Sequence, residues 1–202
     1  MTVIERWVIA GCLAMSGTAW AAPVGTVAVI DRSVARVGDA VIWEYDLDVR
    51  AAGSGGPAQE RAATLEMMID DELIVAEARK SNIDVEKSEV LSALDEIKTQ
   101  NKLDDAGLDA LLKQYGYTRA RYLVDLERQI MILRAKNQLV APQVNVTDAD
   151  VEAEAKLRKL PVPVTETDKS TISRELRRRE IDALTVKWVA DLRKRAWIER
   201  RP

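Results

Sequence analysis

The stretch Val34-Ala35-Arg36-Val37-Gly38-Asp39-Ala40-Val41-Ile42 places two Val-rich segments on either side of a Gly-Asp pair. Branched side chains favour extended backbone, and a Gly-Asp step between two such segments is typical of a hairpin turn. We therefore predict strands over 33–37 and 41–42, with another Val-rich strand over 24–30. The C-terminal stretch Trp197-Ile198-Glu199-Arg200 is also compatible with a strand. We expect it to pair with the N-terminal strands and so to join the two ends of the chain.

Most of the remaining sequence has the spacing of amphipathic helices, with apolar side chains recurring every three or four residues. The segments with this spacing are 59–81, 85–100, 104–112, 119–140, 148–159 and a last helix from Ser170 or Thr171 to about Arg195. Asp104, Thr118 and Thr147 stand where N-terminal helix caps are expected. The predicted fold is therefore mainly α-helical, with a small β-sheet formed by the N-terminal strands and the C-terminal strand.

The first residues have the features of an export signal. Arg6 is followed by the apolar run 7–14, and Ala19-Trp20-Ala21 has the small-x-small pattern of a cleavage site. Two alternatives stay open, namely a retained N-terminal anchor and a lipoprotein signal, because Ile9-Ala10-Gly11-Cys12 is similar to a lipobox. All three readings place the protein outside the cytoplasm. We expect residues 1–21 to be a signal peptide and the localisation to be the periplasm.

The composition argues against an enzyme. The chain has no His and a single Cys, which lies inside the predicted signal, so the commonest general base, metal ligand and thiol nucleophile are missing from the mature protein. No phosphate-binding loop, nucleophile elbow or zinc-ligand spacing is present. We therefore expect no catalytic residue, no metal site and no cofactor.

Charge is distributed unevenly along the chain. Residues 169–202 contain 11 basic and 5 acidic residues, whereas residues 22–168 contain 18 basic and 27 acidic ones. A basic tail is compatible with nucleic acid or an anionic membrane as partner, but export argues against nucleic acid. We expect the basic C-terminal helix to dock on the acidic part of the same molecule, without stable membrane insertion after signal cleavage.

Taken in order, several of these segments resemble SurA-type periplasmic chaperones, over residues 27–158 and 170–200. The segments that carry the resemblance are Val34 to Ile42 with Asp46-Leu47, Met68-Ile69-Asp70-Asp71-Glu72-Leu73-Ile74, Val146-Thr147-Asp148-Ala149-Asp150-Val151 and Ala196-Trp197-Ile198-Glu199. Members of this family usually carry one or two parvulin-type prolyl isomerase domains between the two parts. Here only the 27 residues from Pro142 to Asp168 lie between them, fewer than the roughly 50 that an independent domain needs.

The resemblance implies a chaperone core without its isomerase domain. We expect a SurA-like N-terminal helical domain over 22–160, a linker over 161–168, and a C-terminal helix and strand over 169–202 that complete the same domain. The implied function is non-catalytic binding of unfolded or extended polypeptides, such as outer-membrane protein precursors. The alternative is a dedicated envelope assembly scaffold with a single folded partner.

Candidate peptide-binding residues follow from the chemistry of promiscuous surfaces. Met side chains are flexible and polarizable, and aromatic rings offer a large contact area with few rotatable bonds. On this basis we select seven residues: Trp43, Met67, Met68, Tyr115, Tyr117, Tyr122 and Met131. Ordinary core filling by the three Met residues remains the alternative. We assign Trp188 and Trp197 to the core, and we expect a free edge of the small sheet to accept an extended client.

Overall fold

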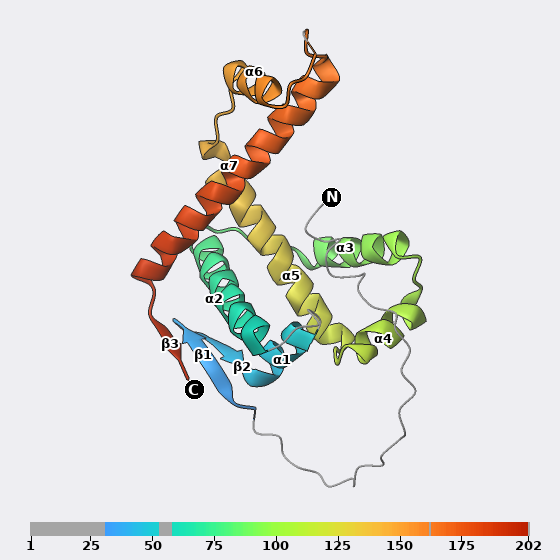
Figure 1. The fold of residues 1–202 in the computed structure, drawn as a ribbon. Helices are drawn as coiled ribbons and strands as arrows, with labels where there is room; N and C mark the ends of the chain where they lie inside the picture. The colour runs from blue at the N-terminus through green and yellow to red at the C-terminus, as the bar shows by residue number, and fades with distance from the viewer. Residues whose placement is uncertain (1–30, 53–57, 162, 202) are drawn as a thin grey trace.

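The computed structural model describes residues 31–52, 58–161 and 163–201 (Figure 1). The predicted export signal and the predicted strand over 24–30 lie outside these residues. Within them, the elements are a three-stranded sheet and a set of helices that surround and extend it. No helix among the described residues combines the length and apolar character needed to cross a membrane.

The sheet joins the two ends of the described chain, as predicted. Its strands are β1 (Ser33–Val37), β2 (Ala40–Trp43) and β3 (Ile198–Arg200), in the order β2-β1-β3 with antiparallel neighbours. In the turn between β1 and β2, Gly38 has a φ of +56°, a left-handed conformation that glycine adopts without a steric penalty. The Gly38 amide also donates a hydrogen bond of 3.0 Å to the carbonyl of Trp197.

The helices lie between β2 and β3 in the predicted order. They are α1 (Glu44–Ala52), α2 (Ala58–Lys80), α3 (Lys87–Gln100), α4 (Asp105–Gln114), α5 (Arg119–Ala135), α6 (Asp148–Leu157) and α7 (Glu166–Arg195). The predicted caps are confirmed, because the side chains of Asp104, Thr118 and Thr147 each accept a backbone N–H from the first turn of the helix that they precede.

One predicted helix boundary is wrong, and one predicted helix ends in a turn of another type. The α7 helix begins at Glu166 rather than at Ser170 or Thr171, because the hydroxyl of Thr165 accepts the Asp168 amide at 3.1 Å and caps the helix earlier. The last three residues of the expected linker 161–168 are therefore helical. The predicted helix 119–140 ends as an α-helix at Ala135 and continues as a π turn, η2 (Lys136–Val140), and a 3-10 turn, η3 (Ala141–Gln143), which contains Pro142.

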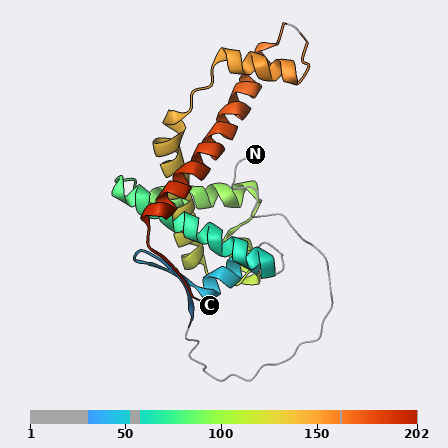
Figure 2. The ribbon, with the colours of Figure 1, turned by 60° about the vertical axis from the view of Figure 1, so that its left-hand side comes forward.

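Three apolar clusters hold these elements together. The largest packs the sheet against α2, α5 and the C-terminal half of α7, and includes Ile42, Ile69, Ile132 and Leu192. The second joins α3, α4 and α5. The third joins α6 to the N-terminal half of α7. As Figures 1 and 2 show, α6 and this half of α7 project away from the sheet as an arm.

The basic C-terminal segment docks on acidic residues of α2, as expected. Arg193 of α7 makes an ion pair of 2.7 Å with Glu66 and another of 2.5 Å with Asp70. Arg200 of β3 pairs with Glu66 at 2.8 Å. In the arm, Arg158 bridges Glu154 and Glu175 at 2.8 and 2.7 Å. The pairs of Arg193 and Arg200 bring part of the basic C-terminal segment against acidic residues from earlier in the chain.

Candidate functional site

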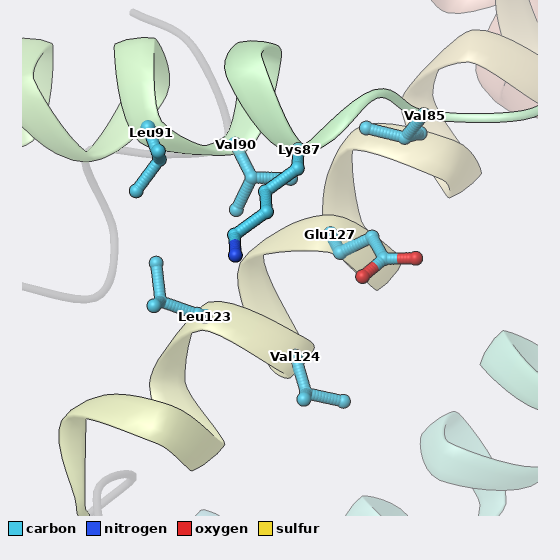
Figure 3. Close-up of a pocket in the computed structure, with 7 residues that line it drawn as sticks. All are labelled: Val85, Lys87, Val90, Leu91, Leu123, Val124 and Glu127. Atoms are coloured by element: carbon cyan, nitrogen blue, oxygen red, sulfur yellow. The ribbon is translucent and has the colours of Figure 1, made fainter.

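An apolar groove lies where α3 crosses α5 (Figure 3). It has a volume of about 340 Å³, and its lining consists of Val85, Lys87, Val90, Leu91, Leu123, Val124 and Glu127. The side chains of Val90 and Leu91 face those of Leu123 and Val124 across it. Because five of the seven lining residues are aliphatic, the groove can accept apolar side chains from another molecule.

Two pairs of adjacent apolar residues build the walls. Neighbouring residues on a helix point about 100° apart, so each pair presents one side chain to the core and one beside it. Val90 is buried in the cluster of α3, α4 and α5, whereas Leu91 keeps 43% of its surface exposed. On α5, Leu123 packs partly against the same cluster, and Val124 is 55% exposed. The second member of each pair is therefore available to a ligand.

Hydrogen bonds and an ion pair fix the start of α3 against α5. Arg134 of α5 pairs with Glu89 at 2.6 Å and also donates to the Asp84 carbonyl. This guanidinium, together with a hydrogen bond from the Glu86 amide, lowers the pKa of the Glu89 carboxyl below its usual range. Since Glu89 lies in the first turn of α3, these contacts hold the α3 wall of the groove in place.

Charge at the groove is limited to one residue on each wall. Lys87 is the first residue of α3, and its side chain runs across the groove towards Leu123 (Figure 3). Glu127 lies on the α5 wall with its carboxylate directed away from the Lys87 ammonium. The site thus combines an aliphatic lining with one cation and one anion at its margins.

Among the seven residues selected from the sequence, Met131 is 4% exposed and lies in the main core with Ile132. Met68 is half-buried and packs against the same cluster. A side chain this deeply buried offers almost no surface to a client, so we correct the expectation for Met131 and assign it to the core. For this residue, the core-filling alternative describes the structure.

Tyr117, between α4 and α5, and Tyr122 in the first turn of α5 form a ring pair. Tyr117 and Tyr122 lie edge to face, with ring centroids 6.4 Å apart, and pack partly against the cluster of α3, α4 and α5. Burial, reinforced by the nearby charge of Asp125, raises the pKa of the Tyr117 hydroxyl to about 12. The pair therefore shares an apolar cluster with Leu123 of the α5 wall.

Three selected residues are exposed but lie on different elements. Trp43 ends β2, Tyr115 follows α4 and Met67 lies on α2. Tyr45, which we did not select, is also exposed, and its hydroxyl donates a 2.6 Å hydrogen bond to the Gly116 carbonyl, next to Tyr115. The structure therefore does not gather the selected residues into one site.

The assignment of Trp197 to the core is wrong. This residue precedes β3 and is 56% exposed, and the guanidinium carbon of Arg36 lies 5.7 Å from the centre of its ring. Trp188 is half-buried against the main core, in agreement with its assignment.

The described residues also contain no group of three acidic, His or Cys side chains arranged to hold a metal ion.

A family model and the curated relatives of this chain both point to SurA-type proteins. The model of the SurA-like N-terminal domain matches residues 4–136. Chaperone SurA of Chromobacterium violaceum is 34% identical over 146 residues, which cover 67% of this chain and 34% of that protein. Chaperone SurA of Thiobacillus denitrificans is 32% identical over 88 residues, which cover 44% of this chain and 20% of that protein. The chain thus spans about a third or less of the length of these curated relatives.

A solved structure shares the fold. It comes from work on the virulence factor PEB4 and the periplasmic protein Cj1289, described as two structurally related SurA-like chaperones in Campylobacter jejuni. The TM-score is 0.58 at 12% sequence identity, over 84% of this chain and 98% of the compared chain. No parvulin prolyl isomerase domain is among the family models that match.

Proposed function

Since this chain belongs to the SurA-like N-terminal domain family, we propose that it is a non-catalytic periplasmic chaperone that binds unfolded or extended polypeptides at the α3–α5 groove. Outer-membrane protein precursors are the proposed clients. Residues 1–21 are proposed to direct export, and residues 22–202 to form one chaperone domain. Because the proposed location is the periplasm, we propose that the protein binds and releases clients without ATP, through the free energy of binding alone.

The observation that carries the proposal is the exposure of Leu91 and Val124 on the facing walls of one groove. Removing an aliphatic side chain of this size from water contributes about 1.5–3 kcal/mol. Such a gain favours an occupant that brings an apolar side chain of its own. Unfolded polypeptides expose these side chains along their whole length, whereas a folded protein buries most of them.

A gain of about 1.5–3 kcal/mol from one apolar side chain is too small to hold a client by itself. We therefore expect weak binding that is spread over several contact points. A dissociation constant of 1 mM already requires about 4.1 kcal/mol, which is more than one side chain in the groove supplies. We therefore propose that Trp43, Met67 and Tyr115 provide further contact points on the same client chain. Met68, Tyr117 and Tyr122 contribute through the part of each ring or chain that stays accessible. Several weak contacts retain a client and still let it leave without ATP.

The sheet supplies a second type of contact. Because β1 is the central strand, β2 and β3 each have one edge without a neighbouring strand among the described residues. An extended client can add to such an edge through backbone hydrogen bonds. These edges are only four and three residues long, so we propose that strand addition supplements the groove.

Light scattering of an unfolded outer-membrane β-barrel protein tests the proposal. Equimolar protein is expected to slow aggregation, and the double variant Leu91→Ser/Val124→Ser is expected to lose most of this effect. The matched control is Leu157→Ser/Val186→Ser, which changes two residues that are even more exposed, at 78% and 71%, but lie away from the groove. Failure of the unmodified protein to slow aggregation contradicts the chaperone function. Equal loss in both double variants contradicts the groove as its site.

A further inference from the structure

Lys87 is an exposed cation at the mouth of the groove, and it forms no ion pair with another described residue. Its side chain crosses the space between α3 and α5, with its aliphatic part against the apolar walls (Figure 3). None of the ion pairs formed within the described ranges involves its ammonium group. By contrast, Lys98 on the same helix pairs with Asp95 at 2.8 Å and with Asp105 at 3.2 Å.

The arginines of α5 are paired with other residues. On α5, Arg121 pairs with Asp46, Arg128 pairs with Glu72, and Arg134 takes up Glu89 from the first turn of α3. Glu127, on the opposite wall, makes no ion pair within the part of the chain that the structure describes, and its carboxylate is directed away from Lys87. The groove therefore presents an unpaired cation on its α3 side and an unpaired anion on its α5 side.

We propose that Lys87 makes the groove select apolar side chains that have a carboxylate beside them in the client chain. This inference rests on the proposed function of the groove. The apolar side chain occupies the space between Leu91 and Val124, and the carboxylate approaches the Lys87 ammonium. Glu127 repels a carboxylate on the α5 side, so the occupant binds with its acidic group towards α3. The carboxylate belongs either to an Asp or Glu side chain or to the end of a polypeptide.

The expected effect is small because the pair is exposed to solvent. Exposed pairs of this kind change an equilibrium constant by about two- to fivefold. The preference should also decrease with ionic strength, because the screening length falls from about 10 Å at 0.1 M salt to about 3 Å at 1 M. The apolar contribution to binding does not decrease with ionic strength in this way. Measurements at low and high salt therefore separate the ionic contribution from the apolar one.

Fluorescence anisotropy with three labelled peptides tests the inference. The peptides share one apolar residue and differ beside it: the first carries Asp and an amidated end, the second Asn and an amidated end, and the third Asn and a free carboxyl end next to the apolar residue. The unmodified protein is expected to bind the first or the third about two- to fivefold more tightly than the second. The first and third peptides distinguish the two sources of the carboxylate.

Variants assign the preference to Lys87. Lys87→Gln is expected to bind all three peptides equally, and Lys87→Glu to prefer the neutral peptide. Lys113→Gln, which removes an exposed lysine from the last turn of α4, is the matched control and should keep the preference. Equal binding of all peptides by the unmodified protein, while Leu91→Ser/Val124→Ser still binds them less tightly, overturns the role of Lys87 alone. If that double variant binds every peptide as tightly as the unmodified protein, the groove itself is not the binding site.

Discussion

Arg193 and Glu66 are 127 positions apart in the sequence, and their side chains meet at 2.7 Å, Nη1 to Oε2. The same carboxylate accepts hydrogen bonds from Arg200 of β3, at 2.8 and 3.0 Å. One residue of α2 therefore holds both the last helix and the last strand of the fold. Sequence composition indicated a basic tail on an acidic body, and this cluster is where the two come together.

Glu66→Gln is expected to lower the free energy of unfolding by about 1 kcal/mol, a modest loss because the ion pairs are partly exposed to solvent. The reason is that the substitution removes the charge that Arg193 and Arg200 share, while leaving the side-chain volume unchanged. Urea denaturation measures the change. Glu96→Gln on α3 is the control, since Glu96 is exposed and makes no ion pair among the described residues. Equal losses in the two variants would mean that the cluster does not stabilise the fold.

The same carboxylate predicts how stability depends on pH. Arg200 and Arg193 lower the pKa of Glu66 from its ordinary 4.5 to about 2. A depressed carboxyl pKa gives a contribution that is fully present above the unfolded-state pKa and is lost as pH falls through the folded-state value. The stability difference between the unmodified protein and Glu66→Gln should therefore be constant above pH 4.5 and disappear as the pH approaches 2. A difference that does not change across this range contradicts the assignment.

Met131 and Met67 should respond differently to substitution by Ala. Met131 is 4% exposed and Met67 is 54% exposed. Met131→Ala leaves a cavity in the main core, so we expect it to lower the free energy of unfolding by about 2–5 kcal/mol. Met67→Ala should change stability by less than about 0.5 kcal/mol and weaken client binding. Thermal denaturation and the light-scattering assay, run on both variants, separate the two roles. A stable Met131→Ala variant with impaired client binding would contradict the assignment of Met131 to the core.

Gly38 should be needed for its backbone conformation alone. A Cβ atom at this position meets no atom within 4 Å, but the φ of +56° is one that side chains rarely adopt. Gly38→Ala is therefore expected to cost about 1 kcal/mol, and Gly38→Asn less, because Asn tolerates this region better. Chemical denaturation of both variants, with Asp39→Ala as control, measures the effect. An Asn variant less stable than the Ala variant would argue against a conformational cause.

Local signals in the sequence predicted most of the fold. The hairpin followed from branched residues around Gly38-Asp39, and Asp104, Thr118 and Thr147 marked true helix starts. The start of α7 was missed although Thr165 and Asp168 repeat the spacing of Thr147 and Asp150. The π turn that follows α5 was not predicted, because the apolar spacing of 119–140 does not distinguish an α turn from a π turn.

The site was less predictable than the fold. Residue type suggested Met and aromatic side chains, but adjacent residues such as Met67 and Met68 point in different directions, and type does not tell which one is covered. Leu91 and Val124 extend the apolar stripes of their helices by one residue, and this widening was the available signal. Whether a neighbouring helix covers it depends on how α3 crosses α5, which only the tertiary structure shows.

Site-specific photo-crosslinking tests the central claim most directly. A photoreactive side chain is placed at Leu91 in one variant and at Leu157 in another, and each is irradiated with an unfolded outer-membrane β-barrel protein. Leu157 is more exposed than Leu91, at 78% against 43%, so exposure alone would favour crosslinks from position 157. Binding at the groove predicts strong crosslinks from position 91 and weak ones from position 157. Crosslinks that follow exposure, with position 157 equal to or stronger than position 91, would contradict the groove as the client site.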